Sequence, residues 1–193
     1  MSRTNYIFVD FENVQETDLD RLMGKPIKVV LVLGERHKSL PVVLVKKLLK
    51  YASQVDLVET GRGGKNALDL ILAHHIGTAK KADPQGYFHI LSRDKGFDAL
   101  IGHLRDSGTL AARHAAFSEI PVLMNNDERV EFITQHFKSK KAPRAGKRKA
   151  LESQIQVLFG KALSPSELND TINALIGRKV LEITPTDEVV YRI

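Results

Sequence analysis

Four aspartates stand at positions where a carboxylate is hard to explain by folding alone. Asp10 ends the first apolar run of the chain, and Asp94 follows a later one, ILS. Asp69 is the one acid in the apolar stretch ALDLILA, and Asp98 comes four positions after Asp94. Carboxylates packed together repel one another and lose hydration, and a divalent cation relieves both costs. Hard oxygen ligands suit Mg²⁺ or Mn²⁺, which activate water and stabilise charge at phosphorus.

Each of these acids also has a plain structural interpretation. Asp69 and Asp98 fall in the first turn of expected helices, where a negative charge stabilises the helix N-terminus. Asp94 can form a surface turn with its basic neighbours, and Glu12 is more readily explained as a solvated side chain. The case for chemistry at Asp10 and Asp94 therefore depends on whether the fold brings them together.

The pattern of apolar runs predicts alternating strands and helices up to about residue 137. The expected strands are 6–10, 27–33, 55–59, 87–92 and 110–115, and the expected helices are 14–23, 39–52, 66–76, 97–108 and 127–137. This rhythm predicts an α/β fold, a doubly wound parallel five-stranded sheet in the order 3-2-1-4-5 between helices. The first and fourth strands are then neighbours at the point where strand order reverses, which is where such sheets bind ligands.

The last part of the chain has a different character. Residues 150–160 and 164–177 predict two short helices, the second with a capping box at Ser164 and a proline in its first turn. Residues 179–193 predict a hairpin. We therefore expect a first domain at 1–137, a basic linker at 138–149 and a small winged-helix-like α+β unit at 150–193. The last unit buries too little apolar surface to be stable by itself.

The basic charge of the chain is local. The stretch KSKKAPRAGKRK, residues 138–149, contains seven of the 29 Lys and Arg residues and no acid. The rest of the chain has 22 basic residues against 23 acidic ones, so the net charge of +6 comes from this tract. Two interpretations stay open, a solvated linker and an arm that attracts the phosphates of a nucleic acid.

Composition excludes several classes of chemistry. The chain has no cysteine, so disulfide scaffolds and thiolate chemistry are excluded. The first residues contain no apolar run of signal-peptide length, and no stretch approaches the roughly 18 apolar residues of a membrane span. We expect a soluble cytoplasmic protein with no membrane partner and no organic cofactor. We expect the small C-terminal unit to dock either on the first domain or on a second copy of the chain.

Three motifs carry a family resemblance. FVDFEN, KNALDLILAHHI and ILSRDKGFDALI, in this order and spacing, resemble the PIN-like nucleases and within them the NYN domain family. The resemblance covers about residues 5–137. It rests on an aspartate with a nearby asparagine after the first strand, a Lys-x-x-x-Asp helix, and a Ser-x-Asp-x-x-Phe turn after the fourth strand.

The resemblance implies a metal-dependent ribonuclease, and an endoribonuclease is the expected type. It implies metal ligands at Asp10, Asp69, Asp94 and Asp98, with Mg²⁺ or Mn²⁺ as the cofactor and RNA as the substrate. It further implies that Asn13 orients a carboxylate or the substrate and that Ser92 supports the turn. The chain departs from the family at Gly96, where many members have a second aspartate, and Asp98 is the candidate to compensate.

The glycine-rich stretch GRGGKN, residues 61–66, lacks the first glycine and the hydroxyl of a P-loop. A loop that faces RNA phosphates and a plain turn are both compatible with it. The residues expected to attract nucleic acid are Arg62, Lys65, Arg93, Lys95, Lys138, Lys140, Lys141, Arg144, Lys147, Arg148 and Lys149. The alternative to a ribonuclease is a nucleic-acid-binding adaptor that keeps the fold with weak or lost turnover.

Overall fold

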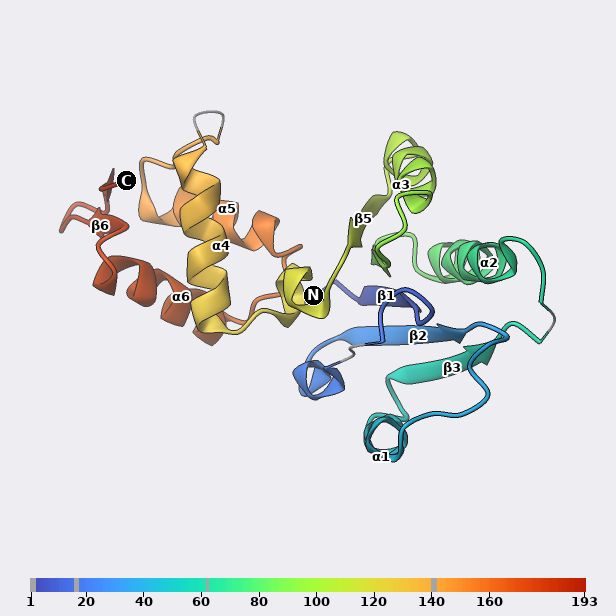
Figure 1. Ribbon diagram of the computed structural model, residues 1–193. Coiled ribbons are helices and arrows are strands. Elements are labelled where there is room, and N and C mark those ends of the chain that lie inside the picture. Colours follow the sequence, from blue (N-terminus) through green and yellow to red (C-terminus); the bar gives the residue numbers. More distant parts are fainter. Residues whose placement is uncertain (1–2, 16–17, 62, 140–141) are drawn as a thin grey trace. The chain divides into compact units, whose positions relative to one another are not determined.

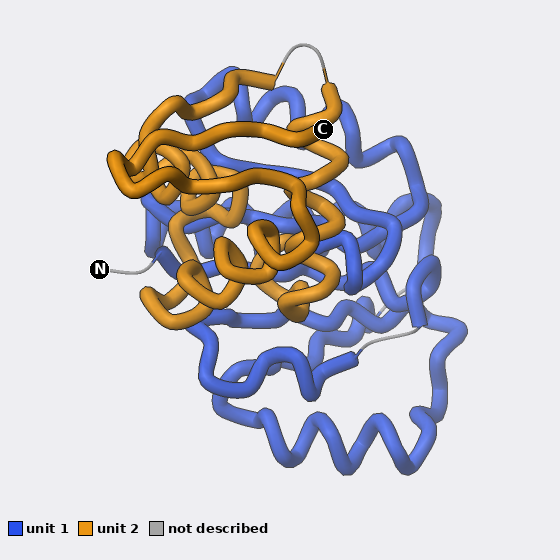
Figure 2. The backbone as a smooth tube through the Cα atoms, turned by 90° about the vertical axis from the view of Figure 1, so that its left-hand side faces the viewer, with its two compact units in different colours: residues 1, 3–120 blue, residues 2, 121–193 orange. Residues whose placement is uncertain are grey.

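The computed structural model describes residues 3–15, 18–61, 63–139 and 142–193 (Figure 1). The chain divides into two compact units, residues 3–120 and residues 121–193 (Figure 2). Three of the expected nucleic-acid contacts, Arg62, Lys140 and Lys141, lie outside the described residues. Among the described residues, no helix is both long enough and apolar enough to cross a membrane.

The first unit is built on a parallel five-stranded sheet. Its strands are β1 (Asn5–Asp10), β2 (Ile27–Leu33), β3 (Val55–Glu59), β4 (Tyr87–Leu91) and β5 (Leu110–His114), in the order β3-β2-β1-β4-β5. Central β1 is buried on both faces, because Ile7, Phe8 and Val9 are all 0% exposed. This burial is typical of a sheet covered by helices on both sides. The predicted α/β fold and strand order are confirmed.

The helices of this unit are α1 (Val42–Lys50), α2 (Ala67–Ala82) and α3 (Phe97–Asp106). Leu72 and Ile76 of α2 and Ile101 of α3 pack with Phe8 and Phe88 of the sheet in one apolar cluster. Side chains four residues apart lie on one face of a helix, which is why Leu72 and Ile76 are buried together. These contacts fix the first turns of α2 and α3 relative to the strands.

The helix expected at residues 14–23 is much shorter in the structure. The described part of this segment has a single 3₁₀ turn, η1 (Leu19–Leu22). Its first and last residues, Leu19 and Leu22, are both 0% exposed. Residues three apart eclipse one another in a 3₁₀ turn, so one turn suffices to bury both leucines. Two further short turns, η2 (Phe117–Glu119) and η3 (Pro121–Leu123), follow β5.

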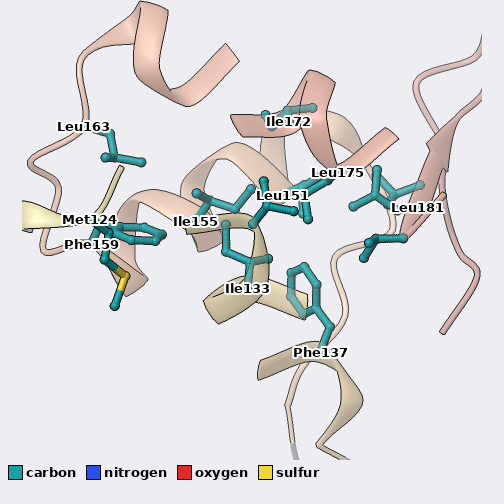
Figure 3. Close-up of a cluster of buried hydrophobic side chains, with 13 residues drawn as sticks. Met124, Ile133, Phe137, Leu151, Ile155, Phe159, Leu163, Ile172, Leu175 and Leu181 are labelled. Atoms are coloured by element: carbon teal, nitrogen blue, oxygen red, sulfur yellow. The ribbon is translucent and has the colours of Figure 1, made fainter. Parts of the chain in front are cut away.

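The second unit contains three helices and a hairpin. They are α4 (Asn126–Lys138), α5 (Arg148–Leu158), α6 (Pro165–Gly177), β6 (Leu181–Ile183) and β7 (Val189–Tyr191). The predicted capping box of α6 is present, since the Ser164 side chain accepts a hydrogen bond from the Glu167 backbone. Ile133, Leu151 and Leu175, one from each helix, meet in a common core (Figure 3).

The boundary between the units differs from the expected one. Helix α4 was expected to close the first domain at residue 137, but its apolar side chains lie in the core of the second unit. Buried Arg129 also pairs with Glu167 at the start of α6, with 2.7 Å between Nη2 and Oε1. A two-helix unit would bury little apolar surface, and α4 supplies what it lacks.

The described part of the basic tract is not a separate linker. Lys138 ends α4 and Arg148 begins α5. Between them, the Gly146 carbonyl accepts a 3.0 Å hydrogen bond from the Val189 amide, and Lys147 forms an isolated antiparallel bridge with Glu188. The end of the tract thus pairs with the hairpin like a short third strand. Together with the three helices, this pairing gives the winged-helix-like arrangement.

Candidate active site

Asp10 is a buried carboxylate held by donors from two loops. It is 1% exposed at the carboxyl end of β1. The side-chain amide of Asn13 donates a hydrogen bond to Asp10 Oδ2 at 2.6 Å, and the Asn13 backbone N–H donates one to Asp10 Oδ1 at 3.2 Å. Ser92 Oγ donates to Oδ2 at 2.7 Å. These bonds replace the lost hydration of the carboxylate and fix its orientation.

Ser92 links Asp10 to the loop that carries Asp94. Ser92 is 0% exposed, and its Oγ accepts a 3.0 Å hydrogen bond from the Asp94 backbone N–H. The Asp94 carboxylate in turn accepts from the Gly96 N–H through Oδ1, at 2.7 Å. The loop after β4 is therefore turned so that Asp94 is exposed beside the end of β1, as the strand order predicts.

Asp69 faces the other acids from the first turn of α2. Burial raises the pKa of its carboxyl, and the charges of Asp10, Asp94 and Glu12 raise it further. Among the described residues, its side chain makes no hydrogen bond or ion pair. The helix-capping interpretation is weakened because Asn66, in a left-handed conformation with φ 62°, makes no capping hydrogen bond. Asp69 is thus a partly buried acid that other acids surround.

Glu12 belongs to the same group of acids, although the sequence favoured a solvated bystander. Its carboxylate lies directly over Gly34, just after β2. A Cβ atom added to Gly34 would fall 1.8 Å from Glu12 Oε1. The absence of a side chain at position 34 makes room for the carboxylate. This relation joins residues 22 positions apart, and no local motif in the sequence reveals it.

A pocket of about 480 Å³ opens at this edge of the sheet. Its walls include the carboxylates of Glu12, Glu35, Asp69 and Asp94 and the cations of Arg36 and Lys65. We call it the acidic pocket. Asp10 does not line it, but Asn13, which holds Asp10, does. The predicted convergence of Asp10, Asp69 and Asp94 is therefore present in the structure, with Glu12 added.

Asp98 does not join the other acids. It forms a two-point ion pair with Arg113, whose Nε lies 2.6 Å from Oδ1 and whose Nη2 lies 3.4 Å from Oδ2. The hydrogen bond from Arg113 is the main cause that lowers the pKa of Asp98. Arg113 also donates to the Ser92 carbonyl at 3.0 Å. Asp98 therefore positions Arg113 against the Ser92 loop, and it does not compensate for Gly96 from this position.

The carboxylates of the acidic pocket are ligands that a hard divalent cation prefers, although they do not form a closed coordination shell. In the part of the chain that the structure describes, no three acidic or histidine side chains meet closely enough to hold a metal ion. Their oxygen donors match the preference of Mg²⁺ and Mn²⁺. The pKa of Asp69 is raised first by burial and then by the charges of Asp10, Asp94 and Glu12, and a bound cation would offset both effects.

The basic residues expected to contact nucleic acid do not gather at one site. Lys65 lines the acidic pocket, Arg93 lines a second pocket, and Lys95 lines neither. In the second unit, Arg144 donates to the Phe137 carbonyl, and Lys147 and Arg148 pair with Glu188 and Glu152. Lys138 and Lys149 are exposed. Much of the tract's charge is thus engaged within its own unit.

Comparison with known proteins identifies the fold of the first unit. A model of the PIN domain matches residues 4–114, more than half of the chain. The matched segment contains β1 to β5, the acids of the acidic pocket, Asp10 and Asp98. The comparisons with curated proteins and with solved structures gave no match. PIN domains are usually nucleases. The chain therefore belongs to the PIN domain family.

Proposed function

We propose that this protein is a divalent-metal-dependent ribonuclease of the NYN branch of PIN domains. The observation that carries the proposal is the convergence of Asp10, Asp69, Asp94 and Glu12 at one edge of the sheet. Neighbouring carboxylates repel one another and lose hydration, which destabilises the fold. Such a group is therefore typical of a functional site, because a stable fold does not require it. Membership of a family whose members are usually nucleases supports this reaction class.

The four acids have different roles in this proposal. Asp69, Asp94 and Glu12 present carboxylate oxygens to the acidic pocket and would hold Mg²⁺ or Mn²⁺ there. Asp10 is buried behind them, and its fixed orientation through Asn13 and Ser92 makes it the anchor of the group. A bound ion supplies a water of lowered pKa and stabilises charge at phosphorus.

The cations of the acidic pocket draw in the substrate. Lys65 and Arg36 line the same walls as the acids, and neither forms an ion pair within the described residues. An RNA phosphate would otherwise be repelled by four carboxylates, and these two side chains offset that repulsion. The loop of residues 63–66 between β3 and α2 thus acts as a substrate contact.

Cleavage of a labelled single-stranded RNA in Mn²⁺ and in EDTA tests the proposal. Asp69→Asn is the informative variant, since the Asp69 side chain makes no hydrogen bond whose loss would disturb the fold. Asp98→Asn is the matched control, because Asp98 is turned toward Arg113. We expect Mn²⁺-dependent cleavage that falls by at least ~100-fold in Asp69→Asn and changes little in Asp98→Asn.

The second candidate is an adaptor that binds nucleic acid without turnover. Two observations favour it: Gly96 leaves the loop after β4 without a second acid, and Asp98 does not replace it. RNA binding with no Mn²⁺-stimulated cleavage of RNA or DNA would establish the adaptor and exclude the ribonuclease.

A further inference from the structure

A second pocket, of about 360 Å³, lies at the same edge of the sheet. It is formed by residues that follow β1, β4 and β5, together with η1 and α1. Its lining residues are Val14, Asp18, Arg21, Lys47, Arg93, Ala115, Ala116, Phe117 and Ser118. Apart from Arg93, none of its charged residues belongs to a sequence motif that suggested a binding site.

This second pocket is basic where the first is acidic. Among its described lining residues, Arg21, Lys47 and Arg93 carry positive charge and Asp18 carries a negative one, while Asp20 beside Lys47 offsets a further part of the positive charge. We call it the basic pocket. Its volume lies within the range of natural ligand pockets, roughly 300–1,000 Å³. Two pockets of opposite charge therefore stand beside one another on one sheet edge.

Two of the three cations are held in place by acids. Lys47 Nζ lies 2.9 Å from Asp20 Oδ2 and 3.7 Å from Asp18 Oδ1. Arg21 Nε lies 3.1 Å from Asp18 Oδ2. These ion pairs hold both side chains in place and offset part of their positive charge. Together they form one wall of the basic pocket.

Arg93 differs from the other two cations. It is exposed, and among the described residues its guanidinium makes no hydrogen bond or ion pair. A guanidinium presents several donors in a planar fork that matches a phosphate group. Arg93 is therefore the cation of the basic pocket whose donors are available to a ligand.

The two pockets share a border along the chain. Asn13 and Asp94 line the acidic pocket, while the residues next to them, Val14 and Arg93, line the basic pocket. Consecutive Cα atoms are only ~3.8 Å apart. A ligand with regularly repeated phosphates can thus pass from one pocket into the other without leaving the protein surface.

We propose that the basic pocket binds a backbone phosphate of a nucleic acid strand, next to the phosphodiester that lies at the acids. Arg93 makes the contact, and Arg21 and Lys47 supply the surrounding positive field. This inference rests on the proposed function, because it takes the acidic pocket as the place of cleavage. A subsite on one side of the acids would fix the register and direction in which the strand lies.

Binding of a fluorescein-labelled single-stranded RNA, measured by anisotropy in EDTA, tests the subsite without turnover. Arg93→Glu is compared with Lys95→Glu, which makes the same charge change two residues away, on an exposed side chain that lines neither pocket. We expect Arg93→Glu to weaken binding about tenfold and to reduce the salt slope by about 0.7, the loss of one phosphate contact. Lys95→Glu should do less than half as much. Equal losses would overturn the proposal. Matched unfolding temperatures confirm that both variants fold.

A second arm separates a strand phosphate from a free anion. Single phosphates of the RNA are replaced in turn by uncharged methylphosphonates. One position should weaken binding by the wild-type protein and have no effect in Arg93→Glu, and the absence of such a position would overturn the proposal. Inorganic phosphate that competes fully at the wild-type site, with no position dependence, would also overturn it. If the position dependence is present but Mn²⁺ supports no cleavage, the subsite stands and the ribonuclease proposal fails.

Discussion

Ser92 Oγ donates a 2.7 Å hydrogen bond to Asp10 Oδ2, across 82 positions of sequence. The same Oγ accepts a hydrogen bond from the Asp94 N–H, so one buried hydroxyl joins the ends of two neighbouring strands. The relation explains how the buried carboxylate of Asp10 is held in a fixed orientation. It also makes the hydroxyl a sensitive point for mutation.

Ser92→Ala should destabilise the first unit. The substitution removes one donor to buried Asp10 and the acceptor of the Asp94 amide, at a cost of about 1–3 kcal/mol. Urea unfolding followed by circular dichroism measures this cost. Ser166→Ala is the control, because Ser166 is exposed and its side chain, among the described residues, bonds to exposed Asp170. Equal stability of the two variants would contradict the linking role of Ser92.

Gly34→Ala should displace the Glu12 carboxylate while the fold persists. The added Cβ would meet only the far end of the flexible Glu12 side chain, so the side chain can move aside. We expect Mn²⁺ affinity, measured by calorimetry, to fall as far as in Glu12→Gln. The double variant should be no weaker than either single variant, because both remove the same carboxylate from the acidic pocket. Additive losses would show that Glu12 does not act there.

The second unit should fold as residues 121–193 but not as residues 138–193. The longer fragment retains α4, whose Ile133 and Phe137 are 0% exposed in the shared core. The shorter one loses those side chains and leaves Glu167 without Arg129. Cooperative thermal unfolding should be seen only for the longer fragment. A cooperative transition in the shorter one would restore the boundary at residue 137.

The stability of the first unit should fall as the pH drops below about 6.5. Buried His89 lies between Asn5 Oδ1, 2.9 Å from Nε2, and His114 Nε2, 3.1 Å from Nδ1. Burial is the main cause that lowers the pKa of both rings, that of His114 to about 4. The folded protein keeps them neutral while the unfolded chain protonates them. Stability is thus complete above pH 6.5 and is lost toward pH 4.

Each histidine should contribute a slope of up to about 1.4 kcal/mol per pH unit in that range. Chemical unfolding at several pH values, with His89→Asn beside the wild-type protein, measures the slope. The variant should show a shallower pH dependence. His103→Asn is the control, because His103 is exposed on α3. An unchanged slope in His89→Asn would contradict this account.

The sequence was enough to predict the sheet and the placement of three acids near one edge of it. Continuous apolar runs mark buried parallel strands, and strand order then brings Asp10 and Asp94 together without further information. Asp69 follows from its place as the one acid in an apolar helix. These inferences succeed because burial and local periodicity leave direct traces in residue order.

What the sequence missed depends on long-range contacts. Glu12 reaches the acidic pocket because Gly34 has no side chain, and Asp98 is drawn away by Arg113 from β5. The assignment of α4 to the second unit depends on its partners, since its own amphipathic pattern fits either unit. The basic pocket joins Arg21 and Lys47 to Arg93 from separate elements, and no motif spans them.

Cleavage of single-stranded RNA in Mn²⁺ by the wild-type protein and by Asp69→Asn shows whether the acidic pocket binds a divalent ion at the place of RNA cleavage. We expect cleavage that EDTA stops and that falls by at least ~100-fold in the variant. Equal cleavage by the two proteins in Mn²⁺, or none by the wild type, would contradict this expectation.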